Sequence, residues 1–150
     1  MNGRRLKVYL DNCCYNRLFD NQNNILNRIE TLSINAIKYL IKIGKYELTW
    51  SYILDFENGQ NPKIINKENT KTWKLLSNEY VAEKDEIINI AKRLMVKGIK
   101  LYDAFHIACA IYNACDYFIT VDKGILKKSH LVEEIVIYNP IDFIKEVENA

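Results

Sequence analysis

The chain has 150 residues, the length of one ordinary domain, so a single domain over residues 1–150 is expected. Hydrophobic residues make up 49% and charged residues 27% of the sequence, which excludes a disordered chain and indicates a protein with a packed core. The net charge of +2 is too small for the whole surface to attract a polyanion, and 5 Gly and 2 Pro are too few for the many turns of an all-β fold.

Strands and helices are predicted to alternate from the N-terminus onward. A β-branched and aromatic segment at residues 7–10 (KVYL) predicts the first strand, and the Asn-rich segment at residues 20–24 is typical of a loop. Over residues 25–43 apolar side chains recur at spacings of three and four, which predicts a long helix that ends near Gly44. The residues of this apolar stripe are Ile25, Ile29, Leu32, Ala36, Leu40 and Ile43.

The alternation continues to the C-terminus. Further strands are predicted at residues 47–50, 117–120 and 134–138. Helical patterns cover residues 52–58, 67–81, 83–97, 101–114 and 141–148. The segment 58–69, with its glycine and proline, is expected to be the most flexible stretch. This order of elements implies crossover connections, so we expect an α/β fold: a three-layer α/β/α sandwich around a mostly parallel sheet.

Two further classes of protein lack support in the sequence. No apolar run reaches the roughly 18 residues of a membrane helix, and the first residues, MNGRRLKVYL, contain no long apolar segment of a secretion signal. A cytoplasmic protein without membrane contact is therefore expected. The four cysteines, at positions 13, 14, 109 and 115, show neither a CxxC pair nor zinc-ligand spacing, so we expect free thiols or core residues.

Acidic residues follow the predicted strands at the points where the strands end. Asp11 comes directly after the first strand, the segment SYILDFE (residues 51–57) follows the second, and Asp122 follows the third. Asp103 lies in the first turn of a predicted helix. Because ligands of open parallel sheets collect beyond the carboxyl ends of the strands, these acids are the first candidates for a functional site.

Each of these acids has a simpler explanation when it is taken alone. Asp11 and Asp122 could cap the helices that follow them, and Asp103 could favour its helix through the helix dipole. Taken together they predict more, because carboxylates within about 4–6 Å of one another repel, which either raises their pKa values or requires a cation. Carboxylate oxygens are hard ligands that favour Mg²⁺ or Mn²⁺.

Four segments carry a resemblance to a known family: VYLDNCCYNRLFD, SYILDFENGQNP, GIKLYDAFHIACA and DYFITVDKGIL. From about residue 7 to residue 143 the chain resembles the PIN-domain nucleases, especially the bacterial ribonuclease toxins of type II toxin–antitoxin modules (virulence-associated protein C-like). The resemblance implies a PIN-like α/β/α sandwich and Mg²⁺ or Mn²⁺ as cofactor. It further implies a metal-dependent endoribonuclease that hydrolyses phosphodiester bonds of single-stranded or structured RNA.

The resemblance also implies roles for individual residues. Four acids, separated by 46, 46 and 19 residues, match the catalytic and metal-binding positions of the family: Asp11, Glu57, Asp103 and Asp122. Thr120 resembles the hydroxyl that orients the first acid, and Asn12 lies beside the site as a supporting residue.

The second acid has an alternative, because Asp55 lies two residues before Glu57. Helix positions i and i+2 point about 200° apart, so only one of the two carboxylates can face a given pocket. Glu57 is favoured because it precedes NGQNP. His106 shares a helix face with Asp103 and is either a substrate contact or, in the favoured interpretation, a satisfied core histidine. Asp116 is expected to have a structural role.

Basic side chains must hold a nucleic-acid strand near acids that would otherwise repel it. Arg17, Lys100 and Lys123 are the candidates, although a solvated basic face explains each of them equally well. The resemblance implies an RNA substrate, a protein antitoxin if the chain is a toxin, and a homodimer. The main alternative is a catalytically inactive PIN-like module that binds RNA or protein. A phospho-accepting receiver domain is disfavoured, because Asn12 stands where that fold needs a second acid.

Overall fold

The computed structural model describes residues 4–149, in which five parallel strands form one sheet in the order β3-β2-β1-β4-β5. The prediction of an α/β fold with a mostly parallel sheet is therefore confirmed. The strands are β1 (Leu6–Leu10), β2 (Tyr46–Ser51), β3 (Glu79–Val81), β4 (Tyr117–Ile119) and β5 (Val136–Tyr138).

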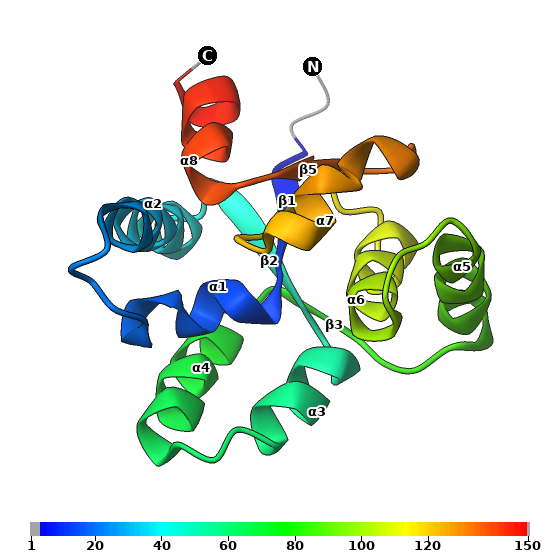
Figure 1. The fold of residues 1–150 in the computed structure, drawn as a ribbon, viewed down its shortest axis with the longest axis horizontal. Coiled ribbons are helices and arrows are strands. Elements are labelled where there is room, and N and C mark those ends of the chain that lie inside the picture. The colour runs from blue at the N-terminus through cyan, green and yellow to red at the C-terminus, as the bar shows by residue number, and fades with distance from the viewer. Residues whose placement is uncertain (1–3, 150) are drawn as a thin grey trace.

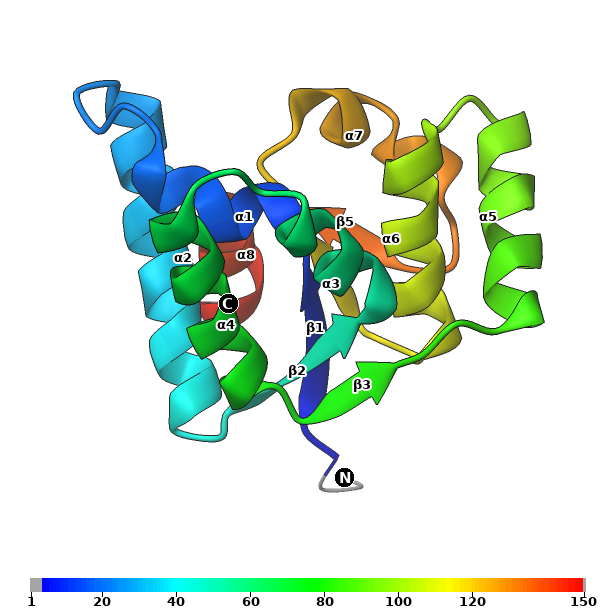
Figure 2. The same ribbon diagram turned by 90° about the horizontal axis from the view of Figure 1, so that it is seen from below.

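Helices connect successive strands and cover both faces of the sheet. Figures 1 and 2 show α2, α4 and α8 on one side and α5 and α6 on the other, which confirms the predicted three-layer arrangement. Their bounds are α1 (Asn12–Asn16), α2 (Ile25–Lys42), α3 (Tyr52–Gly59), α4 (Ile64–Leu76), α5 (Asp85–Val96), α6 (Leu101–Tyr112), α7 (Lys123–Lys127) and α8 (Pro140–Phe143). Short 3₁₀ turns at Arg17–Phe19 and Ser129–Leu131 and a π turn at Ile144–Glu148 complete the elements. None of the helices between residues 4 and 149 is long and apolar enough to cross a membrane.

The central strand is buried on both faces. Val8, Tyr9 and Leu10 of β1 are all 0% exposed, as expected for a parallel strand with helices above and below it. Phe118 of β4 stacks on the ring of Tyr9, with 5.5 Å between the ring centroids. The core therefore fixes β1 against β4, and with them the positions of the residues that follow each strand.

The strand order creates a switch point at the centre of the sheet. The chain builds β1, β2 and β3 outward in one direction and then returns to place β4 on the other side of β1. Leu10 pairs in register with Ile119, and the backbone N–H of Asp11 donates a 2.9 Å hydrogen bond to the carbonyl of Ile119. In such sheets a crevice opens at the carboxyl ends of the two strands that flank the switch point. Figure 2 shows α1, α3 and α7 gathered at this edge.

The helix predicted over residues 67–81 is wrong at both ends. The observed α4 begins at Ile64, inside the segment expected to be flexible, and ends at Leu76. The chain then forms β3, because Asn78 pairs with β2: its side-chain Oδ1 accepts from the N–H of Leu48, and its own N–H donates to the Leu48 carbonyl, both at 2.9 Å. Pairing with a distant strand thus overrides the local helical pattern.

The long helix predicted over residues 25–43 is confirmed as α2, but of the predicted stripe only Leu40 is partly buried and packs against the core. The side chains that α2 buries include Ile34, Ile37 and Ile41. The stripe lies largely in solvent, since Ile25 is 65% and Leu32 is 63% exposed. The helix therefore carries two apolar faces, and one of them is unpartnered among the described residues of this chain.

Asp116 fastens the N-terminal end of β1 to the sheet. Its Oδ2 accepts a 2.8 Å hydrogen bond from the backbone N–H of Lys7, and the Arg4 guanidinium binds both of its oxygens at 2.8 and 3.0 Å. Burial would raise the pKa of Asp116, but the hydrogen bonds and charges of Arg4 and Lys7 outweigh it and hold the pKa below its usual range. These contacts agree with the structural role expected for this residue.

We expect Asp116→Asn to lower the free energy of unfolding at pH 7 by about 1 kcal/mol, the range of a partly exposed ion pair. Because the folded-state pKa is lowered, the stabilisation is present above the unfolded pKa of about 4 and is lost as the pH falls through the folded value. Urea unfolding should therefore show a difference between the two proteins at pH 7 that shrinks at pH 3. A difference that stays constant between the two pH values would contradict this account.

Candidate functional site

Asp11 follows β1 and is held from two sides. Its Oδ2 accepts a 2.9 Å hydrogen bond from the Thr120 hydroxyl, and its Oδ1 accepts one of 2.8 Å from the backbone N–H of Asn12. The Thr120 oxygen in turn accepts a 3.0 Å hydrogen bond from the N–H of Asp122. Asp11 is only 5% exposed. One hydroxyl thus links the residues that follow β1 and β4, and the helix-capping role of Asp11 coexists with its place in the crevice.

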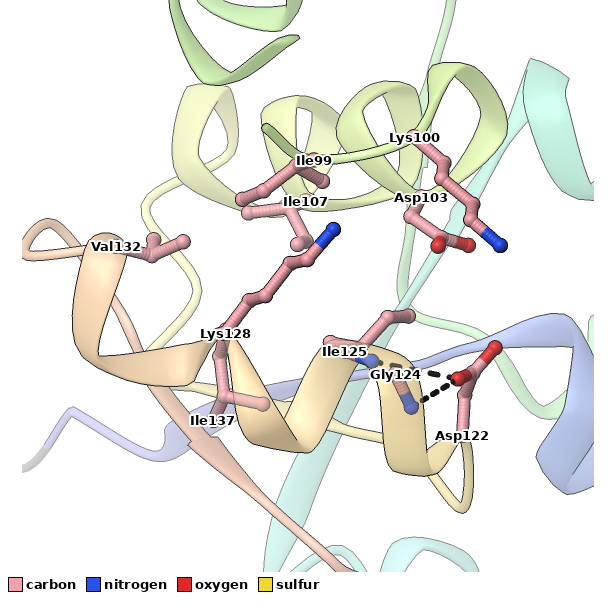
Figure 3. Close-up of a pocket in the computed structure, with 10 residues that line it drawn as sticks. All are labelled: Ile99, Lys100, Asp103, Ile107, Asp122, Gly124, Ile125, Lys128, Val132 and Ile137. Atoms are coloured by element: carbon pink, nitrogen blue, oxygen red, sulfur yellow. Dashed lines mark hydrogen bonds between the residues drawn. The ribbon is translucent and has the colours of Figure 1, made fainter. Parts of the chain in front are cut away.

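Asp103 and Asp122 line one pocket from different elements. Asp103 projects from the first turn of α6, and Asp122 caps α7, where its Oδ1 accepts hydrogen bonds from the N–H groups of Gly124 (2.7 Å) and Ile125 (3.3 Å). Figure 3 shows the two carboxylates on facing sides of the pocket, with Lys100 beside Asp103. The pocket has about 50 Å³ of free space, which is room for an ion and a few waters.

The acids of the crevice interact electrostatically. The pKa of Asp103 is raised to about 6, first by burial and then by the negative charges of Asp11, Asp122 and Glu57, while His106 acts in the opposite direction. A carboxyl group whose pKa rises for these reasons lies among uncompensated like charges. The structure therefore brings the four predicted acids into one electrostatic cluster, although they come from four different segments of the chain.

Glu57 reaches this cluster through His106. The Nε2 atom of His106 contacts Glu57 Oε1 and lies 3.8 Å from Asp11 Oδ1. His106 is 1% exposed, so it is a buried histidine and has no surface with which to contact a substrate. Sequence reasoning missed its carboxylate partner, because the pairing depends on how α3 packs against α6.

Asp55 points away from the cluster and is engaged elsewhere. It accepts hydrogen bonds from the Trp50 indole N–H (2.9 Å) and the Tyr80 hydroxyl (2.8 Å), and it pairs with Lys74 at 3.0 Å. Burial would raise its pKa, but these three partners outweigh burial and lower it. Of the two carboxylates considered for the second acid, Glu57 is therefore the one that the fold directs to the crevice.

The three basic candidates have different surroundings. Lys100 is exposed and lines the pocket of Asp103, and Lys123 is exposed at the first position of α7. Arg17 instead forms ion pairs with Asp20 (2.8 Å) and with the buried Glu30 (3.2 Å). Its guanidinium thus holds the start of α2 in place, and the two lysines are better placed to meet a bound strand.

The donor set of the crevice suits a hard divalent cation, because it consists of carboxylate oxygens. The raised pKa of Asp103 agrees with this fit, since burial raises it first and the repulsion that adds to burial is one that a cation would relieve. Among residues 4–149, however, no three His, Cys, Asp or Glu side chains already stand where they could share one ion. The acids form a charged cluster rather than a preassembled coordination shell.

Three residues around the cluster had no functional signal in the sequence. Tyr9 and Ser51 are fully buried in β1 and β2, and the Tyr9 hydroxyl lies 2.6 Å from His106 Nδ1 and 2.7 Å from Ser51 Oγ. Cys13 Sγ lies 3.3 Å from Asp11 Oδ2. Tyr and Ser in strands and a Cys in a short helix are usual in a core, and only their neighbours in the fold reveal these contacts. All four cysteines are free, as expected.

The contrast between the neighbouring acids of α3 generates a prediction about stability. Asp55→Asn weakens two hydrogen bonds and an ion pair, so it should lower the free energy of unfolding by about 1–3 kcal/mol. Glu57→Gln keeps an acceptor for His106 and should cost less. Urea unfolding of the two variants at pH 7 checks this order, and a larger loss for Glu57→Gln would show that the assignment of the two side chains is wrong.

Two of three comparisons with known proteins agree with this architecture. The third, with curated protein sequences, finds no match. Solved structures with a similar fold include a chain of the crystal structure of VapBC2 from Rickettsia felis bound to a DNA fragment from their promoter, with a TM-score of 0.58 and 14% sequence identity over 89% of this chain and 98% of that chain. Residues 8–131 match the family model described as PIN domain. Since this match spans most of the sequence and includes all four acids of the crevice, the chain belongs to the PIN domain family.

Proposed function

We propose that this protein is a metal-dependent endoribonuclease whose site consists of Asp11, Glu57, Asp103 and Asp122. The observation that carries the proposal is the arrangement of the acids: Asp103 and Asp122 line one pocket, and His106 contacts Glu57 and lies 3.8 Å from Asp11. Burial and the three other acids raise the pKa of Asp103 to about 6. A cluster of this kind at the switch point of a PIN domain has the chemistry to hold Mg²⁺ or Mn²⁺ and to act on a phosphodiester.

The chain's own residues have separate tasks in this scheme. Asp11 and Asp122 are held by hydrogen bonds from Thr120 and from the N-terminus of α7, so their carboxylates are oriented before any ligand binds. Asp103 faces the same pocket from α6. Bound to these carboxylates, a divalent cation would polarise the phosphodiester and make a water molecule more acidic. Lys100 and Lys123 lie beside the acids, where they can neutralise phosphates of the strand on either side of the cleaved bond.

The alternative function is an inactive PIN-like module that binds RNA or protein without cleavage. Binding of RNA without cleavage does not require an acidic cluster, because carboxylates repel the phosphate backbone. A module of that kind would retain RNA with or without divalent ions, whereas the proposed nuclease requires them. The electrostatic coupling of Asp103 to the three other acids favours the nuclease.

The exposed face of α2 supports a protein partner as well. We propose that the apolar stripe from Ile25 to Ile43, about 27 Å long at 1.5 Å per residue, binds an amphipathic helix of an antitoxin. Leu32 and Ile43 are 63% and 58% exposed, and contiguous apolar patches of this kind mark interaction sites. One solved structure with a similar fold is that of VapBC2 bound to a DNA fragment from their promoter, and this likeness supports a toxin–antitoxin role for this chain.

The nuclease proposal predicts that removing one acidic charge abolishes cleavage. With Mg²⁺ or Mn²⁺ present, Asp11→Asn and Asp103→Asn should cut a labelled RNA at least about 100-fold more slowly than the wild type, the scale of losing one preorganised group in an active site. Glu68→Gln is the matched control, because it removes one carboxylate charge from a side chain that is 63% exposed on α4. Denaturing gel electrophoresis with and without EDTA measures the rates. Equal cleavage by all four proteins would reject the site.

The partner proposal predicts a loss of binding without a loss of fold. Leu32→Lys should prevent co-purification with a co-expressed antitoxin, while circular dichroism and metal-dependent cleavage stay unchanged. Val96→Lys is the control, because Val96 is also apolar and is 89% exposed on α5. Undiminished co-purification of Leu32→Lys would contradict the assignment. Light scattering of the same samples tests the homodimer that the family resemblance implies.

A further inference from the structure

A continuous chain of hydrogen bonds leads from β2 to the acidic cluster. The backbone N–H of Leu54 donates to Ser51 Oγ at 3.3 Å, Ser51 Oγ lies 2.7 Å from the Tyr9 hydroxyl, and that hydroxyl lies 2.6 Å from His106 Nδ1. His106 Nε2 then contacts Glu57 Oε1. Ser51, Tyr9 and His106 are 0%, 0% and 1% exposed. The hydrogen-bond chain is therefore shielded from solvent along its whole length up to Glu57.

The hydrogen-bonding capacity of the groups fixes one end of this hydrogen-bond chain. A carboxylate only accepts, so the His106 nitrogen that contacts Glu57 carries a proton and donates it. The Tyr9 hydroxyl, which can both donate and accept, lies between His106 Nδ1 and Ser51 Oγ, and Ser51 Oγ accepts from the Leu54 N–H. Each of these polar groups therefore has a partner.

The orientation of the Glu57 side chain depends on this hydrogen-bond chain alone, whereas Asp11 and Asp122 are each held by two hydrogen-bond donors. Asp11 is fixed by a hydroxyl and a backbone N–H, and Asp122 by two N–H groups of α7. The Glu57 carboxylate accepts a hydrogen bond only from His106 among the contacts of residues 4–149, and it sits near the end of the short helix α3. Its Oε2 remains available for a ligand.

We propose that Tyr9 and His106 are positioning residues that orient Glu57 toward the cation of the cluster, with Ser51 fixing the Tyr9 hydroxyl. The proposal rests on the proposed function, because it assumes that Glu57 takes part in cation binding. Hydrogen-bond partners behind a metal-binding carboxylate fix its orientation, and their loss commonly weakens metal binding about 10- to 100-fold. Since His106 lies one helical turn after Asp103, the same face of α6 supplies one acid and supports another.

Manganese titration of the protein in the absence of RNA tests the proposal. Isothermal calorimetry or electron paramagnetic resonance should show that Tyr9→Phe binds Mn²⁺ several-fold more weakly than the wild type, and His106→Ala about tenfold or more. His106→Gln, whose amide can still donate to Glu57, should recover part of the loss. Tyr46→Phe is the matched control. It also removes a phenol hydroxyl from a strand residue, in this case from β2, and that hydroxyl donates a 2.6 Å hydrogen bond to Glu148.

A second measurement reports the hydrogen-bond chain directly. In ¹⁵N-labelled protein, His106 should carry a proton at Nε2, and its Nδ1 resonance should move in Tyr9→Phe and not in Tyr46→Phe. Coupling identifies the target: in a Glu57→Ala background, Tyr9→Phe should no longer change the Mn²⁺ affinity.

The outcomes separate the two proposals. A wild type that binds no Mn²⁺ and cuts no RNA rejects the proposed nuclease and, with it, any positioning role for His106. A wild type that binds Mn²⁺ while Tyr9→Phe and His106→Ala bind it equally well overturns only the positioning role. A His106 that carries no proton at Nε2 cannot donate to Glu57, and this result overturns the positioning role.

Discussion

The hydrogen bond between Thr120 and Asp11 is the contact on which the candidate site depends. It joins residues 109 positions apart in sequence, and it forms because β1 and β4 are neighbouring parallel strands at the switch point of the sheet. The same hydroxyl also accepts from the backbone of Asp122. Two acids are thus placed with respect to each other by one small side chain in the floor of the crevice.

The helices bring the remaining acids to that floor. The start of α6 directs Asp103 into the pocket, and the packing of α3 against α6 brings Glu57 to His106. The electrostatic cost of gathering these carboxylates appears in the raised pKa of Asp103. Repulsion within such a cluster lowers the stability of the folded protein, and groups with perturbed pKa values of this kind are concentrated at functional sites.

The sequence predicts the layered architecture and the acids because both depend on strong local patterns. Apolar segments alternate with helical periods, and parallel strands carry their ligands at one edge, so the order of elements along the chain is enough to group Asp11, Asp103 and Asp122. The angle between helix positions i and i+2 predicts that Asp55 and Glu57 point different ways, and in the structure Glu57 contacts His106 while Asp55 binds Trp50. The catalytic role of the four acids remains a prediction.

The parts that the sequence does not predict depend on contacts between distant segments. Strand β3 is only three residues long and forms because Asn78 pairs with Leu48, which no local pattern reveals. Periodicity alone does not identify the buried side of α2, because that helix has two apolar faces and the sheet selects the one with Ile34 and Ile37. Tyr9 and Ser51 give no functional signal, because residues of these types in strands usually serve packing alone.

The two outer strands of the sheet limit how this protein can associate. Both β3 and β5 are three residues long, so each edge offers few unpaired backbone groups to an incoming strand, which protects the sheet from edge-to-edge aggregation. Assembly by strand addition is therefore disfavoured, and side-chain surfaces of the outer helices are left to determine which chains this protein recognises.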